Sequence, residues 1–174
     1  GTVAMWQMNG TAISAASYPL AANSGWKLIP TQEGGMLTGD AGANGLTGTG
    51  GGDTLSGGLG NDTLTGGVGA DLFRFDTAPN AATNLDTITD FLSGTDHLQL
   101  ENAVFTALSA AGAIPAGSFI SGAGVSTAAD ANDFLIYNTT TGALYYDPDG
   151  NGGSAPTQFA TLSAHPALGG GDFV

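Results

Sequence analysis

Residues 57–74 read GGLGNDTLTGGVGADLFR, and in this stretch glycine, aspartate and a bulky apolar residue recur nine positions apart. The same spacing reaches back along the chain, with large apolar residues at Leu37, Leu46, Leu55, Leu64 and Phe73. Two positions before these residues stand Gly35, Asn44, Asp53, Asp62 and Asp71. A Gly-rich flexible linker has no reason to keep aspartate and leucine in phase. The pattern therefore indicates a repeated structural unit rather than a linker.

The best-formed repeats are 57–65 and 66–74, which match G-G-x-G-x-D-x-U-x at every specified position. Repeat 48–56 lacks one glycine, and repeat 39–47 carries Asn44 in place of the aspartate. A six-residue turn followed by a three-residue strand makes half a coil, so eighteen residues complete one coil and the apolar residue points inward. The spacing predicts a parallel β-roll over residues 34–76, with alternate repeats on the same side.

The turns of this roll carry oxygen donors that suit calcium. Calcium takes six to eight oxygens at about 2.3–2.6 Å and mixes carboxylates with carbonyls. Glycines at the first, second and fourth positions of the repeat are expected to adopt positive φ and turn carbonyls toward a common centre. Two loops stacked one coil apart supply enough oxygens, whereas one loop does not. We therefore expect Asp53 to pair with Asp71 on one side, and Asn44 with Asp62 on the other.

The predicted metal ligands of the roll are these four side chains together with loop glycines. The glycines are Gly51, Gly57, Gly58, Gly60, Gly66, Gly67 and Gly69. Asn80 follows Asp62 by eighteen residues and is a candidate to close a further site, although residues 75–83 have lost the glycines. We expect about two or three sites, with Asp53–Asp71 the best formed. A phosphate-binding loop does not fit, because no helix or lysine follows the glycines.

The charge of the chain agrees with a bound cation. The formal net charge is -13, and Lys27 and Arg74 are the only basic residues among 174. Nucleic acids and anionic membrane surfaces are poor partners for such a chain, because both require Lys or Arg to neutralise phosphates. The chain has no cysteine, which excludes disulfides and thiolate metal sites. No apolar run approaches the ~18–20 residues that span a bilayer.

These motifs resemble the RTX (repeats-in-toxin) family. Residues 70–100 are similar to the segment that follows the repeats in serralysin-type C-terminal domains, and YYDPDGNGG, QFATL and the final DFV resemble C-terminal regions of proteins exported by type I secretion systems. The resemblance covers about 45–174 and implies Ca²⁺ as the cofactor, a β-roll packed on further strands, and a secreted or cell-surface location. It also implies a secretion signal ending at Phe173–Val174, read by the type I secretion apparatus.

Two acidic segments outside the repeats allow two interpretations each. In the resembling family, acidic residues of the D-x-I-x-D-F segment bind an ion beside the last coil, which makes Asp86, Asp90 and Asp96 candidates; the alternative is loop solvation and turn capping. Asp147, Asp149 and Asn151 fit the start of an EF-hand loop, but Gln158 replaces the expected glutamate. A polar turn between two strands is the favoured interpretation there, and an accessory calcium site is the alternative.

The remaining segments are predicted to be β-rich, so the fold class is all-β, a parallel β-roll packed on an antiparallel sheet or sandwich. Residues 1–33 are expected to form short strands that end a preceding propeller-like repeat. Residues 77–174 are expected to form a cap of antiparallel strands, including HLQL, FLIY, ALYYD and TQFATL, with one short helix in ENAVFTALSAA.

No catalytic constellation is evident in the sequence. There is no G-x-S-x-G nucleophile elbow, and His97 and Glu101 do not form an H-E-x-x-H zinc motif. We therefore predict a non-enzymatic calcium-binding module of a longer secreted protein, which folds on extracellular calcium after type I secretion and helps to export and stabilise its parent. The alternative is a calcium-dependent adhesin or a polysaccharide-binding appendage of a carbohydrate-active enzyme, with Trp6 and Trp26 as a possible sugar-stacking surface.

Overall fold

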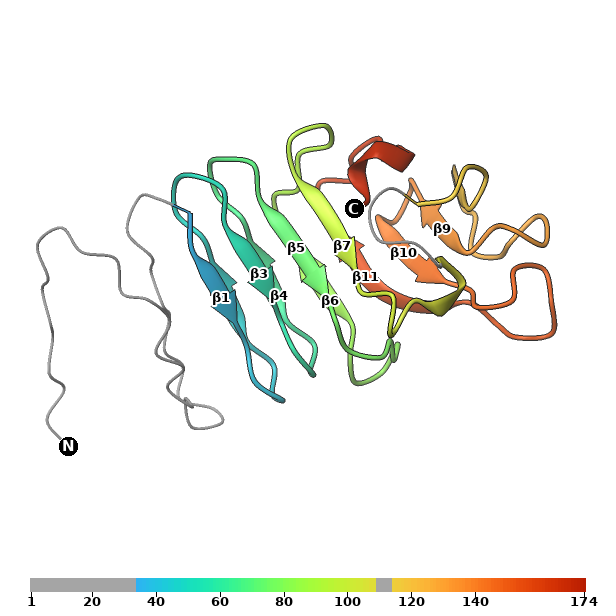
Figure 1. Ribbon diagram of the computed structural model, residues 1–174, viewed down its shortest axis with the longest axis horizontal. Helices are drawn as coiled ribbons and strands as arrows, with labels where there is room; N and C mark the ends of the chain where they lie inside the picture. Colours follow the sequence, from blue (N-terminus) through green and yellow to red (C-terminus); the bar gives the residue numbers. More distant parts are fainter. Residues whose placement is uncertain (1–33, 109–113) are drawn as a thin grey trace, which may run out of the picture.

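The computed structural model describes residues 34–108 and 114–174. The propeller-like strands expected in 1–33, and with them Trp6 and Trp26, lie outside the described residues. In the described part, Figure 1 shows two stacked layers of short strands that form a roll, followed by the strands of the C-terminal half along the same direction.

The strands of the roll alternate between two sheets. The first sheet has the order β1 (Met36–Thr38), β3 (Thr54–Ser56), β5 (Leu72–Phe75) and β7 (His97–Leu100). The second sheet begins with β2 (Gly45–Thr47), β4 (Thr63–Thr65) and β6 (Asp86–Ile88). All these neighbours pair in parallel. Consecutive strands therefore enter opposite sheets, which is the predicted parallel β-roll.

The register confirms the eighteen-residue coil. Leu37 pairs with Leu55 and Leu55 with Phe73 in the first sheet, while Leu46 pairs with Leu64 in the second. Leu37, Leu55, Leu64 and Phe73 are at most 1% exposed, and Leu46, in the first described strand of the second sheet, is partly buried. Burying one such side chain contributes about 1.5–3 kcal/mol. These stacked inward-facing side chains, Leu37, Leu46, Leu55, Leu64 and Phe73, are called the ladder below. The ladder supplies most of the apolar contacts that stabilise strands only three or four residues long.

The roll continues past residue 76, where the sequence analysis ended it. Ile88 of β6 pairs with Leu64, and Leu98 of β7 pairs with Phe73. These steps are 24 and 25 residues long instead of eighteen, because longer loops precede β6 and β7. One further coil thus extends the roll to Leu100, inside the segment that was expected to form the cap.

The C-terminal strands extend the second sheet instead of forming a separate sheet against the roll. They are β8 (Phe119–Gly122), β9 (Leu135–Asn138), β10 (Ala143–Tyr146) and β11 (Thr157–Leu162). The β9–β10–β11 pairings are antiparallel as predicted, but β8 pairs with β9 in parallel and β11 pairs in parallel with β6 of the roll. Roll and cap therefore share one sheet of seven strands.

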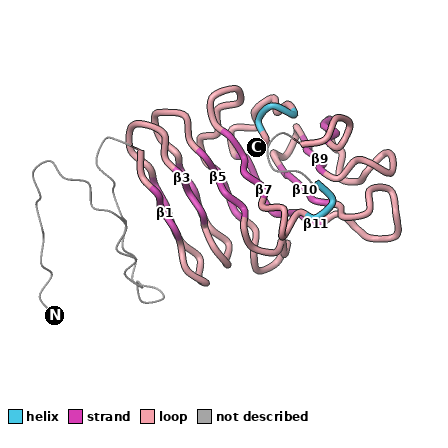
Figure 2. The backbone as a smooth tube through the Cα atoms, in the orientation of Figure 1, coloured by secondary structure: helices cyan, strands magenta, loops and turns pink. Residues whose placement is uncertain are grey.

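Helical structure in the described residues is limited to two 3₁₀ turns, η1 (Thr106–Leu108) and η2 (Gly170–Asp172) (Figure 2). The short helix expected in residues 101–111 is thus reduced to η1 in the described part, and residues 109–111 lie outside it. None of the described helices is long and apolar enough to cross a membrane.

Candidate metal centre

The loops of the roll hold two rows of carboxylates. The first row runs through Gly35, Asp53, Asp71 and Asp96, and the second through Asn44, Asp62 and Asp86. In each row the aspartate Oδ1 accepts the backbone N–H of the preceding member, for example Asp53 N–H at 2.8 Å from Asp71 Oδ1 and Asn44 N–H at 2.7 Å from Asp62 Oδ1. The structure thus brings together both pairs that the spacing predicts.

Beyond Asp62, the second row continues through a residue that the spacing does not predict. Asp86, and not Asn80, accepts the Asp62 N–H, at 3.1 Å. The Asn80 side-chain oxygen instead accepts the N–H groups of Ala82 and Thr83 at 3.0 and 3.1 Å, as in a turn. The placement of Asn80 beside Asp62 was therefore wrong, because the loop before β6 is longer than in the repeats.

The first row gains Asp96 in the same way, since its Oδ1 accepts the Asp71 N–H at 3.0 Å. The sequence groups Asp96 with Asp86 and Asp90 as a candidate ligand and does not predict its place in a row. A signal for both additions exists in the sequence: Asp86-Thr87-Ile88 and Asp96-His97-Leu98 keep the D-x-U spacing of the repeats without their glycines.

The Oδ2 atoms of the row aspartates differ in whether they have a hydrogen-bond partner. Asp53 Oδ2 accepts the Thr49 N–H at 2.9 Å, and Asp96 Oδ2 accepts the Leu92 N–H at 2.8 Å. The Oδ2 atoms of Asp62 and Asp71 are buried and have no hydrogen-bond partner. A buried carboxylate oxygen without a partner carries a desolvation cost that a cation would relieve. These two oxygens belong to the two repeats that match the pattern fully.

Glycine at the first repeat position leaves room for those carboxylates. A Cβ added at Gly57 would lie 2.8 Å from Asp62 Cγ, and one at Gly66 would lie 2.8 Å from Asp71 Cγ, with Oδ2 nearer still in both loops. Neither glycine has positive φ, so the expectation of positive φ at this position was wrong and close approach is the actual requirement.

The second and fourth repeat positions follow the expectation. Gly58 and Gly67 have φ of 89° and 98°. The fourth-position glycines with positive φ are Gly51, Gly60 and Gly69. At Gly60 and Gly69 a Cβ would also collide with the backbone of the loop eighteen residues earlier. Stacked loops therefore approach each other too closely for a side chain at these positions.

Burial and repulsion by neighbouring carboxylates oppose the charged form of Asp62, Asp71 and Asp86. Burial raises the pKa of Asp86 to about 7, and the neighbouring Asp62 charge adds to the rise. Burial also raises the pKa of Asp62 and of Asp71, and the charges of Asp96, Asp53 and Asp90 contribute at Asp71. The rows therefore concentrate negative charge, and the raised pKa values of Asp62, Asp71 and Asp86 reflect a setting that a divalent cation relieves.

The one basic side chain in the described part does not neutralise the rows. Arg74 pairs with Glu101 at 2.9 Å and lies 3.6 Å from Asp76. No group of three or more His, Cys, Asp or Glu side chains converges on one point within 34–108 and 114–174. A calcium ion in the roll would therefore take carboxylate oxygens from a row and its other oxygens from loop carbonyls, a mixture that calcium accepts.

Asp90 holds two stacked loops together. Its oxygens accept the N–H groups of Gly66 and Gly67 at 2.9 and 2.8 Å. These contacts are those of a loop cap, one of the two interpretations of this residue. Ion binding by Asp90 stays a prediction.

The loop that carries Asp147, Asp149 and Asn151 joins β10 to β11, as expected of a polar turn. Asp147 Oδ1 accepts the Asp149 N–H at 3.2 Å, and the Asn151 N–H donates to the Asp130 carbonyl at 3.0 Å. Asp147 is buried. An accessory calcium site in this loop stays a prediction.

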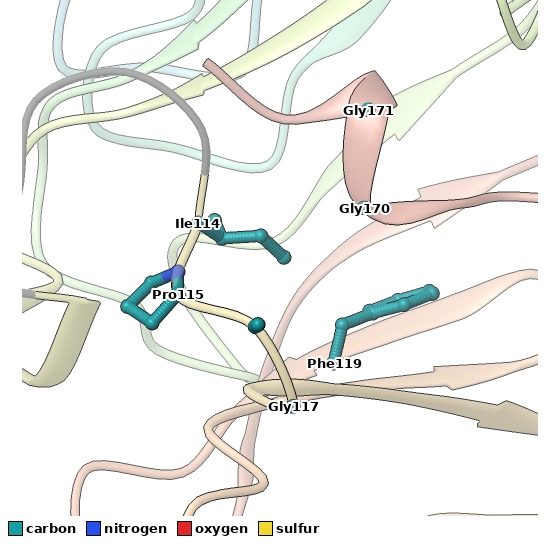
Figure 3. Close-up of a pocket in the computed structure, with 7 residues that line it drawn as sticks. Ile114, Pro115, Gly117, Phe119, Gly170 and Gly171 are labelled. Carbon is teal, nitrogen blue, oxygen red and sulfur yellow. The ribbon is translucent and has the colours of Figure 1, made fainter.

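A pocket of about 320 Å³ lies away from both rows, between residues 114–119 and η2 (Figure 3). Its lining consists of residues 114–117, Phe119 and residues 170–171 and includes no titratable side chain. It does not contribute to the metal centre.

Comparisons with known proteins found one family and one solved structure to which the chain is similar. Residues 52–113 match the family model described as the Peptidase M10 serralysin C terminal. No curated protein matches the sequence. Among solved structures, the solution structure of the AlgE6R3 subunit from the Azotobacter vinelandii mannuronan C5-epimerase is similar at a TM-score of 0.40 and 21% identity, covering 91% of this chain and 86% of that chain. Over residues 52–113 the chain is therefore similar to the C-terminal domain of serralysins, and its described residues form a parallel β-roll.

Proposed function

We propose that this chain is a calcium-dependent folding module of a secreted protein. The observation that carries the proposal is the pair of buried, unpartnered Oδ2 atoms on Asp62 and Asp71, each facing a glycine that leaves it room. Bound calcium would supply the positive charge that those oxygens lack. The residues that would hold it are the aspartates of the two rows and the carbonyls of the loops stacked above and below them.

The behaviour of the chain without calcium follows from its composition and geometry. The row aspartates repel one another, and thirty glycines give the unfolded chain high conformational entropy. Strands of three or four residues contribute few hydrogen bonds each. Because calcium would bind the stacked loops and not the extended chain, its binding free energy becomes folding free energy. The proposal is therefore a transition from a largely unfolded chain to a folded roll.

Such a transition suits export. A chain that stays unfolded at low calcium inside the cell can pass through a narrow type I secretion channel, and folds where calcium is abundant outside. The module would then be secreted, with a structural rather than a catalytic role, and would stabilise the larger protein that it belongs to. The serralysin-type match over residues 52–113 supports this part of the proposal.

The test is calcium titration of the full chain, followed by far-UV circular dichroism and calorimetry, with magnesium as the control ion. We expect β-structure to be lost in chelator and restored by calcium but not by equal magnesium. Asp71→Asn and Asp62→Asn should each weaken calcium binding, whereas Asp130→Asn, at an exposed position outside the rows, should not. An unchanged spectrum in chelator, together with no heat of calcium binding, would refute the proposal.

A further inference from the structure

The loop 92–96, which leads into β7, is held by a carboxylate from a distant part of the chain. Asp172 Oδ1 accepts the Gly94 N–H at 2.8 Å, and Ser93 Oγ lies 3.1 and 3.0 Å from the two Asp172 oxygens. Asp172 Oδ2 also accepts the Gly169 N–H at 2.7 Å. Asp172 is 4% exposed, so each of its oxygens is buried against donors and the carboxylate is satisfied.

The same loop is held from the other side by the last member of the first row. Asp96 Oδ2 accepts the Leu92 N–H at 2.8 Å, and Asp96 Oδ1 accepts the Asp71 N–H at 3.0 Å. Asp71 is the member of this row whose Oδ2 has no partner. The five-residue loop 92–96 thus lies between Asp172 on one side and the candidate metal ligand Asp71 on the other, with Asp96 as the connection.

The residues that follow Asp172 anchor it to the roll. Phe173 is 1% exposed, forms a parallel bridge with Leu98 of β7, and packs its ring 5.2 Å from that of Phe119. The Val174 N–H donates to the Leu98 carbonyl at 3.0 Å. Figure 1 shows this end of the chain beside β7. The segment 172–174 therefore adds to the first sheet directly after the loop that Asp172 holds.

We propose that Asp172 is a positioning residue for the first row: by fixing loop 92–96 it sets the place of Asp96 and, through it, the calcium affinity of the Asp71 end of that row. The second row ends at Asp86, in a different loop, and has no contact with Asp172. The effect is therefore specific to one row. This inference rests on the proposed calcium-binding function.

The hydrogen-bond partners of Asp172 suggest a conservative substitution that tests its role. Every group that approaches its two oxygens is a hydrogen-bond donor. Asp172→Asn keeps the size of the side chain but replaces one acceptor with an NH₂ group that faces N–H donors. Ser93→Ala is a milder variant, since it removes the hydroxyl contacts to Asp172 and to the Ala167 carbonyl at 3.1 Å and leaves Gly94 bound.

The experiment measures calcium affinity by calorimetry in two backgrounds of the full chain. Asp62→Asn disables the second row and reports on the first, whereas Asp71→Asn disables the first and reports on the second. Added to the Asp62→Asn background, Asp172→Asn should weaken calcium binding by about 10- to 100-fold, the usual effect of losing an outer support of a metal ligand. Added to the Asp71→Asn background, Asp172→Asn should change calcium affinity by less than twofold. Asp130→Asn should leave calcium affinity unchanged in both backgrounds.

The possible results separate the two proposals. An equal loss of calcium affinity in both backgrounds would mean that Asp172 only stabilises the whole domain. No loss in either background would mean that loop 92–96 keeps its position without Asp172. Each of these results overturns this inference and leaves the proposed function intact. If Asp172→Asn does not fold, Ser93→Ala takes its place, with a smaller loss expected in the Asp62→Asn background alone. A wild-type chain that binds no calcium would overturn the proposed function and this inference together.

Discussion

Gly66→Ala tests whether the first glycine of a repeat is required by the carboxylate five residues later. The added Cβ would lie 2.8 Å from Asp71 Cγ and 3.0 Å from Asp71 Cβ, distances that real structures avoid. Gly66 does not have positive φ, so the substitution adds no backbone strain and isolates the steric effect. The Asp71 carboxylate must therefore move away, by about 1 Å to regain ordinary contact distances.

That movement has a cost that the structure defines. It lengthens the 2.8 Å bond from Asp53 N–H to Asp71 Oδ1, and the loss of a buried hydrogen bond that leaves its donor unpaired costs about 1–3 kcal/mol. At 1.4 kcal/mol for each factor of ten, calcium affinity should fall by about 5- to 150-fold. The assay is calorimetric calcium titration, with the folding midpoint in calcium followed by circular dichroism.

Gly50→Ala is the matched control. Gly50 also lies in a loop of the roll, but a Cβ there meets nothing within 4 Å and φ is not positive. The calcium affinity of Gly50→Ala should stay within about twofold of the wild type, since substitutions that create no clash and no backbone strain usually change stability by less than about 0.5 kcal/mol. Equal affinities for Gly66→Ala and Gly50→Ala would refute the steric account of the first repeat position.

Three further predictions follow from the rows and the ladder. In calcium-free buffer, β-structure measured by circular dichroism should increase on acidification. The pKa of Asp86 is raised from 3.8 to about 7 in the folded chain, so the stability that its protonation contributes is present below 3.8 and lost as pH rises through about 7. More β-structure at pH 8 than at pH 4 would contradict this prediction. Asn44→Asp should tighten calcium binding in calorimetry but destabilise the calcium-free chain, because Asn44 Nδ2 now donates to Asp40 Oδ1 at 3.1 Å and a carboxylate there would repel it; weaker calcium binding would count against the row. Phe73→Ala should cost about 3–5 kcal/mol in denaturant unfolding with calcium present, since Phe73 is fully buried in the ladder; a cost under about 1 kcal/mol would show that the ladder is not the core.

The part of the fold that repeats could be predicted, because one short unit determines both register and burial. Leu55 and Phe73 had to face each other once the coil was eighteen residues long, and the same spacing placed Asp53 beside Asp71. Sequence phase is sufficient here since each coil meets only its neighbours.

The last coil and the cap could not be predicted on the same grounds. The loops before β6 and β7 insert six and seven residues beyond the eighteen-residue step, so counting from Asp62 reached Asn80 instead of Asp86. The pairing of β11 with β6 is set by contacts between residues more than seventy positions apart, such as Leu162 with Ile88, and no local pattern encodes them. The contact between loop 92–96 and Asp172 likewise could not be predicted from residue spacing, because Asp172 lies outside the repeats.

The alternation of consecutive strands between the two sheets also restricts how such a chain can change in length. Loss of a single nonapeptide, such as 48–56, would reverse the parity of every later strand: Leu64 would follow Leu37 in the first sheet, and β6 would arrive on the side away from β11. Loss of two nonapeptides, such as 48–65, shortens the roll by one whole coil and preserves the seam with the cap. Whole repeats should therefore be gained or lost in pairs, that is, in units of eighteen residues, whereas extra residues within a loop, as before β6 and β7, leave the sheet assignment unchanged.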